Sequence, residues 1–484
     1  MIEKLNPQEV WKNFHSITQV PRPSKREDKI RAFFYNYGKS LGLETIEDEA
    51  GNVIIKKPAT PGKENVKGVV IQGHMDMVPQ KNADVKHDFD NDPIQAYVDG
   101  EWVRAKGTTL GADNGIGVSM GMAVLESTDI KHGPIELLIT TDEETGMTGA
   151  RELKPGVLDG DILINLDSET EGELYVGCAG GLDVSAAFSY DEVAAPEDFL
   201  SYKLSVKGFE GGHSGMDIIL CRGNSNILAA RVLLTLMEKY DVRLASIEGG
   251  SLRNAIPRET FADILIPTAV LNDVEAEVAK LKADIKSEYS VTDPQADIFI
   301  EKAASEIESY IDDELALEAM KAVFACPAGV ERMSDQMPGL VETSNNVAIV
   351  KSENGKIHVK CLMRGSVDSA KAAYAQKIKA FFELSGAEVE FTGGYSGWAP
   401  NSSSEILKTL KEVYANMYGK TPAVMAIHAG LECGILSGAY PHWDMISFGP
   451  TILSPHSPGE AVNIESVEKC WNFLKTALEN IPAK

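Results

Sequence analysis

The sequence predicts an α/β fold, in which a mixed sheet flanked by helices is interrupted by an inserted α+β domain. Apolar runs typical of buried strands alternate with a helical pattern in the first third of the 484 residues, and this character returns after about residue 400. Between these parts the order of strands and helices changes. We therefore expect one domain built from residues 1–186 and 399–484, and an inserted domain at residues 187–398.

The first part of the chain contains three short apolar runs and one helical pattern. The runs are GVVIQ (68–72), IELLIT (135–140) and DILINL (161–166), and the predicted helix is VSMGMAVLEST (118–128). Polar clusters follow the runs, namely His74-Met75-Asp76, Asp142-Glu143-Glu144 and Asp167-Ser168-Glu169. In open α/β sheets, ligands bind outside the carboxyl ends of the strands. We therefore expect the three clusters to converge on one edge of the sheet.

The inserted part and the last part complete the predicted elements. The inserted part has predicted strands at 202–209, 242–248, 260–266, 346–350, 357–363 and 387–393, and predicted helices at 225–240 and 370–384. An Asn354-Gly355 pair between two of these strands is a strong hairpin signal. The order suggests two similar halves, although no sequence repeat proves a duplication. The last part has predicted helices at 403–418 and 464–479 and an apolar run at 445–448.

The composition limits the classes of partner. A formal net charge of −26 makes attraction to nucleic acid or to an anionic membrane unfavourable, because binding phosphates requires clustered Lys and Arg. The six cysteines are scattered and form no CxxC pair, which indicates reduced thiols in a cytoplasmic protein. We find neither a signal peptide nor an uninterrupted apolar stretch of about 18 residues. A small-molecule or peptide ligand is expected.

Five residues in the polar clusters and loops form a candidate ligand set for two metal ions. His74 alone would be weak evidence, since a His-x-Asp tripeptide is most often a surface pair. The chain also supplies Asp113 in the loop TTLGADNGIG, Glu144 in DEETG, Asp167 in LDSE and His456 in SPHSPGE. Two histidines and three carboxylates, one of them shared, suit a pair of zinc ions.

Two acidic residues beside the ligands have separate expected roles. Side chains of neighbouring residues on an extended segment point different ways, so Glu144 can bind metal while Glu143 faces a metal-bound water and acts as a general base. Asp76 lies on the same side of an extended chain as His74 and can orient its imidazole. An acidic triplet standing alone would instead indicate a solvated strand end.

The motifs GHMDMVPQ, TTLGADNGIG, TTDEETGMTGA, NLDSE, GGHSG and SPHSPGE, in this order, resemble those of the co-catalytic zinc exopeptidases. This family includes aminoacylase, carboxypeptidase G and the carnosinases, and the motifs span nearly the whole chain. The resemblance implies that His74 and Asp167 bind one zinc, Glu144 and His456 the other, and that Asp113 bridges them. It also implies a cis peptide bond between Asp113 and Asn114.

The resemblance further implies that the inserted domain is a lid that supplies substrate-binding residues. His213 in GGHSG would stabilise the oxyanion, and Asn254 and Arg364 would bind the substrate backbone and its free carboxylate. Outside the insert, the glycine-rich stretch IHAGLECG is expected to line the cleft, where Gly430 would contact the substrate. GGHSG does not fit the G-x-S-x-G nucleophile elbow of a serine hydrolase, because residue 216 is methionine. An alternative for Arg364 is a surface salt bridge. His428 competes with His456 for the last ligand position, and the SPHSPGE context favours His456.

These observations predict a dizinc dipeptidase that hydrolyses unblocked dipeptides, with a preference for C-terminal histidine that the resemblance implies. Manganese or cobalt can substitute for zinc with the same ligands. Alternatives are a deacylase of N-acyl amino acids and a non-catalytic binding protein on a peptidase scaffold. A dinucleotide-binding site is set aside, because GIGVSMG at 115–121 is one residue too long for the fingerprint. The sequence leaves open whether a homodimer forms, and whether His213 would serve its own subunit or a partner.

Overall fold

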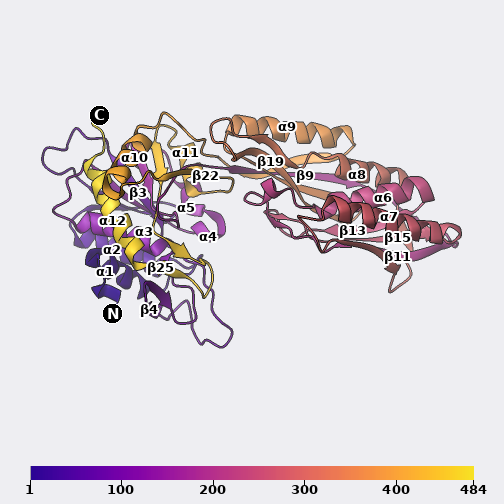
Figure 1. Ribbon diagram of the computed structural model, residues 1–484, viewed down its shortest axis with the longest axis horizontal. Coiled ribbons are helices and arrows are strands. Elements are labelled where there is room, and N and C mark those ends of the chain that lie inside the picture. The colour runs from indigo at the N-terminus through magenta and orange to yellow at the C-terminus, as the bar shows by residue number, and fades with distance from the viewer. Residues whose placement is uncertain (1) are drawn as a thin grey trace. The chain divides into compact units, whose positions relative to one another are not determined.

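The computed structural model describes residues 2–484, which divide into two compact units. The first unit contains Met1–Gly177, Trp398–Ala426 and Leu431–Lys484, and the second contains Cys178–Gly397 and Ile427–Gly430. The first unit therefore combines the indigo N-terminal helices with yellow C-terminal elements such as α12 (Figure 1). The domain boundary expected at residue 186 falls inside strand β9 (Gly180–Ser189), which pairs along its whole length with a strand of the second unit.

A mixed eight-stranded sheet forms the centre of the first unit. Its strand order is β1-β2-β6-β3-β7-β23-β8-β22. The bounds are β1 Glu44–Glu47, β2 Val53–Lys57, β6 Ile135–Thr140, β3 Val69–His74, β7 Ile162–Asn165, β23 Asp444–Ser447, β8 Glu173–Cys178 and β22 Ala423–Ile427. Strands β6, β3, β7 and β23 are parallel, and every residue of β3, β6 and β7 is buried, as expected for a sheet covered on both faces.

Helices cover this sheet, and a smaller sheet lies in the same unit (Figure 1). The helices are α1 Gln8–Thr18, α2 Asp28–Ser40, α3 Ala112–Glu126, α4 Glu143–Gly146, α5 Thr148–Glu152, α10 Glu405–Tyr418, α11 Glu432–Ala439 and α12 Ile464–Glu479. The four-stranded sheet has the order β24-β25-β5-β4, with bounds Ile452–Leu453, Ala461–Asn463, Trp102–Ala105 and Ala96–Asp99. The predicted α/β fold with a mixed sheet flanked by helices is confirmed.

A nine-stranded antiparallel sheet forms the second unit. The order is β16-β11-β15-β13-β19-β20-β9-β21, and β18 pairs with β19. The further bounds are β16 Asp297–Lys302, β11 Phe199–Lys207, β15 Thr260–Pro267, β13 Arg243–Gly249, β19 Val341–Glu353, β20 Lys356–Gly365, β21 Glu388–Tyr395 and β18 Gly329–Met333. Asn354 and Gly355 both have positive φ in the turn between β19 and β20, so the predicted hairpin is present.

Four helices pack against this sheet and share one apolar core with it (Figure 1). They are α6 Ser225–Tyr240, α7 Leu271–Glu288, α8 Asp313–Ala325 and α9 Asp368–Leu384. Two short strand pairs complete the unit, β10 Glu192–Ala194 with β17 Ser309–Ile311 and β12 Gly212–His213 with β14 Ala255–Ile256. No helix within residues 2–484 is both long enough and apolar enough to cross a bilayer.

Candidate metal centre

The parallel strands of the first unit bring three polar clusters to one edge of the sheet. Gln72 of β3 pairs with Asn165 of β7, and His74, the last residue of β3, pairs with Thr140, the last residue of β6. Asp76, Glu143 and Asp167 therefore follow neighbouring strands at their carboxyl ends. The convergence that the apolar runs predict is present.

Asp113 and His456 reach this edge from other segments. Asp113 lies in the first turn of α3 with non-helical φ and ψ of −77° and 111°, and its peptide bond to Asn114 is cis. Asn114 donates a hydrogen bond from Nδ2 to the carbonyl of Leu166, at 2.7 Å, which attaches the start of α3 to the end of β7. His456 lies in the loop between β24 and β25 with φ of +58°.

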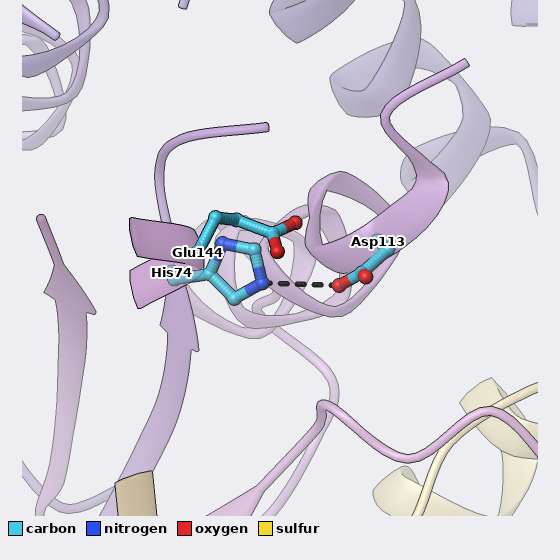
Figure 2. Close-up of side chains that lie close together, drawn as sticks. All are labelled: His74, Asp113 and Glu144. Atoms are coloured by element: carbon cyan, nitrogen blue, oxygen red, sulfur yellow. Dashed lines mark hydrogen bonds and ion pairs between the residues drawn. The ribbon is translucent and has the colours of Figure 1, made fainter. Parts of the chain in front are cut away.

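The carboxylate of Asp113 lies between two imidazoles. Its Oδ1 is 3.0 Å from Nε2 of His74, and its Oδ2 is 3.0 Å from Nε2 of His456. The same Nε2 of His74 is 3.4 Å from Oδ1 of Asp167, and that of His456 is 3.0 Å from Oε2 of Glu144. Figure 2 shows the side chains of His74, Asp113 and Glu144 converging, and their ligand atoms lie within 4.8 Å of one another. Each imidazole thus has a carboxylate of its own and shares Asp113.

The cluster is short of positive charge. Hydrogen bonds to Asp113 and Glu144 raise the pKa of His456 to about 11. Burial together with the nearby charges of Asp113 and Glu144 raises the pKa of Asp167 to about 6, against the lowering effect of His74. Burial opposes protonation of His74, yet the charge of Asp167 and the contacts of the imidazole with Asp113, Asp167 and Asp76 hold the pKa of His74 well above its usual value. Carboxylates this close together are stabilised by any cation that binds among them.

The donor set fits divalent metal ions. Imidazole nitrogens and carboxylate oxygens are the ligands that zinc takes in catalytic sites. Oε1 of Glu144 and Oδ1 of Asp167 are buried and have no hydrogen-bond partner among residues 2–484, so these oxygens have free lone pairs. Buried polar atoms are normally paired, so these two unpaired acceptors beside the imidazoles fit a role as metal ligands.

Asp76 connects the end of β3 to the acidic segment after β6. It is fully buried, and its Oδ1 lies 3.3 Å from Nδ1 of His74. Its two oxygens also accept the backbone N–H groups of Glu143, at 3.0 Å, and Glu144, at 3.3 Å. The sequence predicts the contact with His74 but gives no sign of the other two. Asp76 therefore positions three residues of the cluster at once.

The segment around Glu143 is helical, and the prediction of an extended segment is wrong. Asp142 has φ of +52°, which turns the chain into the single helical turn of α4. Thr145 and Thr148 donate hydrogen bonds to Asp142, and Lys25 donates one from Nζ at 2.9 Å, so the turn is held by two nearby threonines and by one lysine from a distant part of the chain. Glu143 and Glu144 still point differently, because adjacent helical side chains are separated by about 100°. Burial and the charges of Asp167, Glu432 and Glu144 raise the pKa of Glu143 well above its usual value, although His74 opposes this.

A second group of buried carboxylates lies on the other side of Asp76. Glu27, Asp76 and Asp142 have ligand atoms within 4.8 Å of one another. The ammonium of Lys25 pairs with Asp142 at 2.9 Å and its backbone N–H donates to Glu27 at 2.8 Å. Because this group already holds a cationic side chain and contains no imidazole, the first cluster is the better candidate for metal.

The structure reveals two further buried residues that the motifs alone do not assign. Arg22 donates hydrogen bonds to the carbonyls of Met75, at 3.0 Å, and Asp76, at 2.8 Å, and also to Gly111. Glu460, in the same SPHSPGE motif as His456, accepts hydrogen bonds from the backbone of the Asp113 loop. The only sequence signal for Glu460 is its position in that motif. Arg22 has none.

The second unit contains a separate polar cluster around Arg364. This guanidinium is 3% exposed and donates to Ser214 Oγ and Tyr395 Oη, both at 3.2 Å, while its Nη2 lies 3.3 Å from Nε2 of His213. None of the ion pairs within residues 2–484 includes Arg364 and its side chain is buried, so the alternative of a surface salt bridge does not hold. Burial and the charge of Arg364 lower the pKa of His213, so its imidazole is neutral at neutral pH. A buried, unpaired guanidinium calls for an anion.

The remaining candidates of the second unit lie near this cluster. Gly430 packs against Tyr395, since a Cβ on Gly430 would come within 2.9 Å of the phenol oxygen. Asn254 is exposed and accepts the backbone N–H of Ser214 through its carbonyl, at 2.8 Å. His428 is buried, and its Nε2 lies 2.7 Å from Oγ of Ser344. Among the two candidates for the last ligand position, His456 contacts Asp113 and Glu144, whereas His428 is engaged by a serine.

Comparisons with known proteins give one consistent result. The model of peptidase family M20/M25/M40 matches residues 70–480. The cytosol non-specific dipeptidase of Escherichia coli K12 is 43% identical over 489 residues, covering 100% of this chain and 99% of that protein. The crystal structure of aminoacylhistidine dipeptidase from Vibrio alginolyticus superposes with a TM-score of 0.94 at 47% identity, covering 100% and 99%. Aminopeptidase PepT from Bacillus cereus shares the fold, with a TM-score of 0.58 at 17% identity and 99% coverage of both chains.

Proposed function

Because the chain belongs to peptidase family M20/M25/M40 and is a metallopeptidase, we propose that it is a cytoplasmic dizinc dipeptidase that prefers dipeptides ending in histidine. The observation that carries the proposal is the carboxylate of Asp113, with one oxygen 3.0 Å from each of two imidazoles. The relatives named cytosol non-specific dipeptidase and aminoacylhistidine dipeptidase support the substrate class, and the first of these names supports the compartment. The two names differ in the range of dipeptides that they describe, so the preference for histidine is decided by a substrate panel.

The ligands divide into two sets around Asp113. His74 and Asp167 would hold one ion, Glu144 and His456 the other, and Asp113 would bridge them. The distances of 3.4 Å between His74 and Asp167 and of 3.0 Å between His456 and Glu144 support this division. When bound, a pair of zinc ions lowers the pKa of water towards 7 and polarises the scissile carbonyl.

The residues around the ligands would move the proton and orient the groups. Glu143 would take a proton from the attacking water and return it to the leaving amine, and burial together with nearby carboxylates raises the pKa of Glu143, which favours such a role. Asp76 fixes the backbone of Glu143 through its N–H and the ring of His74 through Nδ1. The base and the first imidazole are therefore held by one buried carboxylate.

The polar cluster of the second unit would bind the substrate. Arg364 is suited to the free carboxylate of a dipeptide, because its guanidinium is buried and has no acidic partner within residues 2–484. We assign oxyanion stabilisation to the neutral His213, substrate-backbone binding to Asn254, and a close substrate contact to Gly430. An N-acetyl amino acid also presents a carboxylate, so a deacylase is the competing outcome of the substrate test.

A metal titration followed by a substrate panel tests this proposal. We expect two zinc ions per chain and hydrolysis of Xaa-His and other unblocked dipeptides, with little hydrolysis of N-acetyl amino acids, and we expect a chelator to abolish the activity. Glu143→Ala should keep both ions and lose about 10²- to 10⁴-fold in kcat, while Glu152→Ala, at an exposed position in α5, should behave as wild type. Wild-type kcat in Glu143→Ala would disprove the general base, and preferential hydrolysis of N-acetyl amino acids would replace the dipeptidase with a deacylase.

A further inference from the structure

Glu460 makes an unusual set of contacts for a residue outside the proposed ligand set. Its side chain is 2% exposed, and its carboxylate accepts four consecutive backbone N–H groups. Oε2 accepts those of Leu110 and Gly111, at 2.6 and 3.0 Å. Oε1 accepts those of Ala112 and Asp113, at 2.7 and 3.2 Å. One side chain thus holds the whole segment that ends at the proposed bridging residue.

Glu460 also stands four residues after His456, in the hairpin loop between β24 and β25. The strands of this hairpin pair through Ile452 with Val462 and Leu453 with Ala461, which leaves residues 454–460 as the loop. The side chain of His456 is 53% exposed, so little packing holds it. Glu460 is therefore a direct connection between the loop that carries His456 and the segment that carries Asp113.

Arg22 holds the other side of the same segment. It donates to the carbonyl of Gly111, while its other nitrogen donates to the carbonyls of Met75 and Asp76 just after β3. The segment from Leu110 to Asp113 is consequently fixed to the His74 side of the cluster by Arg22 and to the His456 side by Glu460. The two attachments use different backbone groups, the N–H groups of the segment for Glu460 and the carbonyl of Gly111 for Arg22.

We propose that Glu460 is a positioning residue that sets the distance between Asp113 and His456, and thereby the affinity for the cation held by His456 and Glu144. The proposal rests on the proposed function, since it takes these residues as ligands. The two cation sites should respond differently to the loss of Glu460. Loss of Glu460 weakens the cation at His456, whereas Arg22 keeps Asp113 in place for the cation at His74 and Asp167.

Glu460→Gln tests this claim with almost no change in shape. A carboxamide keeps one acceptor oxygen, and its NH₂ group faces two of the four N–H donors, so about half of the attachment is lost. The control is Glu465→Gln at an exposed position at the start of α12, where the side chain is 72% exposed. Residues that hold metal ligands in place typically change metal affinity by about 10- to 100-fold when replaced.

The readout is metal affinity, measured by titrating the metal-free protein with Zn²⁺ against a competing chelator and with Co²⁺ by its visible spectrum. We expect two tight sites in wild type and Glu465→Gln, but one tight site and one site weakened about 10- to 100-fold in Glu460→Gln. Activity of Glu460→Gln should recover as Zn²⁺ is raised. In Glu460→Asp, which keeps the charge, the zinc affinity of the second site should lie between those of wild type and Glu460→Gln.

Three results separate the possible failures. Two wild-type affinities in Glu460→Gln would overturn the positioning role and leave the proposed function intact. Equal weakening of both sites would also overturn it, because it would indicate a general structural role. If wild type itself bound fewer than two ions, the proposed function would fail first. Should Glu460→Gln not fold, as judged by circular dichroism, Glu460→Asp gives the same test. Wild-type zinc affinity at both sites of Glu460→Asp, or equal weakening of both sites, would then overturn the inference.

Discussion

Protonation of His428 should weaken the second unit at mildly acid pH. This imidazole is 5% exposed, and its Nε2 lies 2.7 Å from Oγ of Ser344. Burial, together with the charges of Arg364 and His213, lowers its pKa from 6.5 to about 3. Below pH 6.5 the unfolded chain therefore binds a proton at this position that the folded chain does not bind.

The sign and the magnitude follow from this difference in proton binding. The unfolded state binds more protons, so stability rises with pH between about 3 and 6.5 and falls on acidification. At pH 5 the unfolded imidazole is almost fully protonated and the folded one almost fully neutral. The loss relative to pH 7.5 is then about 2 kcal/mol, since the 1.5 pH units below the unfolded pKa each contribute about 1.4 kcal/mol.

Hydrogen exchange of the β19 and β20 amides measures the opening free energy of this unit. Between pH 7.5 and 5, wild type should lose about 2 kcal/mol more than His428→Gln, because all other titrations are common to both proteins. Ser344→Ala removes the hydroxyl partner without removing the titrating group, so it should lower stability by a similar amount at both pH values. An equal pH dependence of wild type and His428→Gln would refute the reasoning and show that His428 is protonated in the folded chain.

Two further predictions concern the proposed metal centre and the Arg364 cluster. Asp76→Asn leaves a carboxamide NH₂ facing one of the N–H groups of Glu143 and Glu144. The value of kcat/KM, measured by steady-state kinetics at saturating zinc, should therefore fall about 10- to 100-fold. An unchanged kcat/KM would mean that Asp76 does not position the base. Arg364→Lys replaces a fork of donors by a point charge, so KM for dipeptides should rise about tenfold. The control Arg332→Lys, at an exposed position, should have no effect on KM. Equal KM values in wild type and Arg364→Lys would show that Arg364 does not bind the substrate.

Much of the fold follows from local patterns in the sequence. The predicted ranges 135–140, 225–240 and 464–479 coincide with β6, α6 and α12, because each is an apolar pattern bounded by capping or turn residues. The helix predicted at 118–128 spans Ala112–Glu126. Its earlier start is not predicted because the segment before residue 118 is glycine-rich, and Glu460 caps that start from a distant part of the chain. Local propensity contains no information about such a tertiary cap.

In the candidate site, too, the sequence predicts some features and leaves others that depend on contacts between distant parts of the chain. The proposed ligands follow apolar runs or lie in glycine-flanked loops, and the rule that strand ends meet at one edge places them together. The helical turn at Glu143 depends on a left-handed Asp142 and on Lys25, which lies 117 residues earlier in the chain. The four N–H groups bound by Glu460 come from about 350 residues away, so pairing of this kind is visible only in three dimensions.

The central claim is that Asp113 bridges two metal ions. Anomalous diffraction at the zinc edge, from crystals of the zinc-loaded protein, tests it most directly. We expect two peaks, one between Asp113 and His74 and the other between Asp113 and His456. A single peak, or a peak among Glu27, Asp76 and Asp142 instead, would contradict the account.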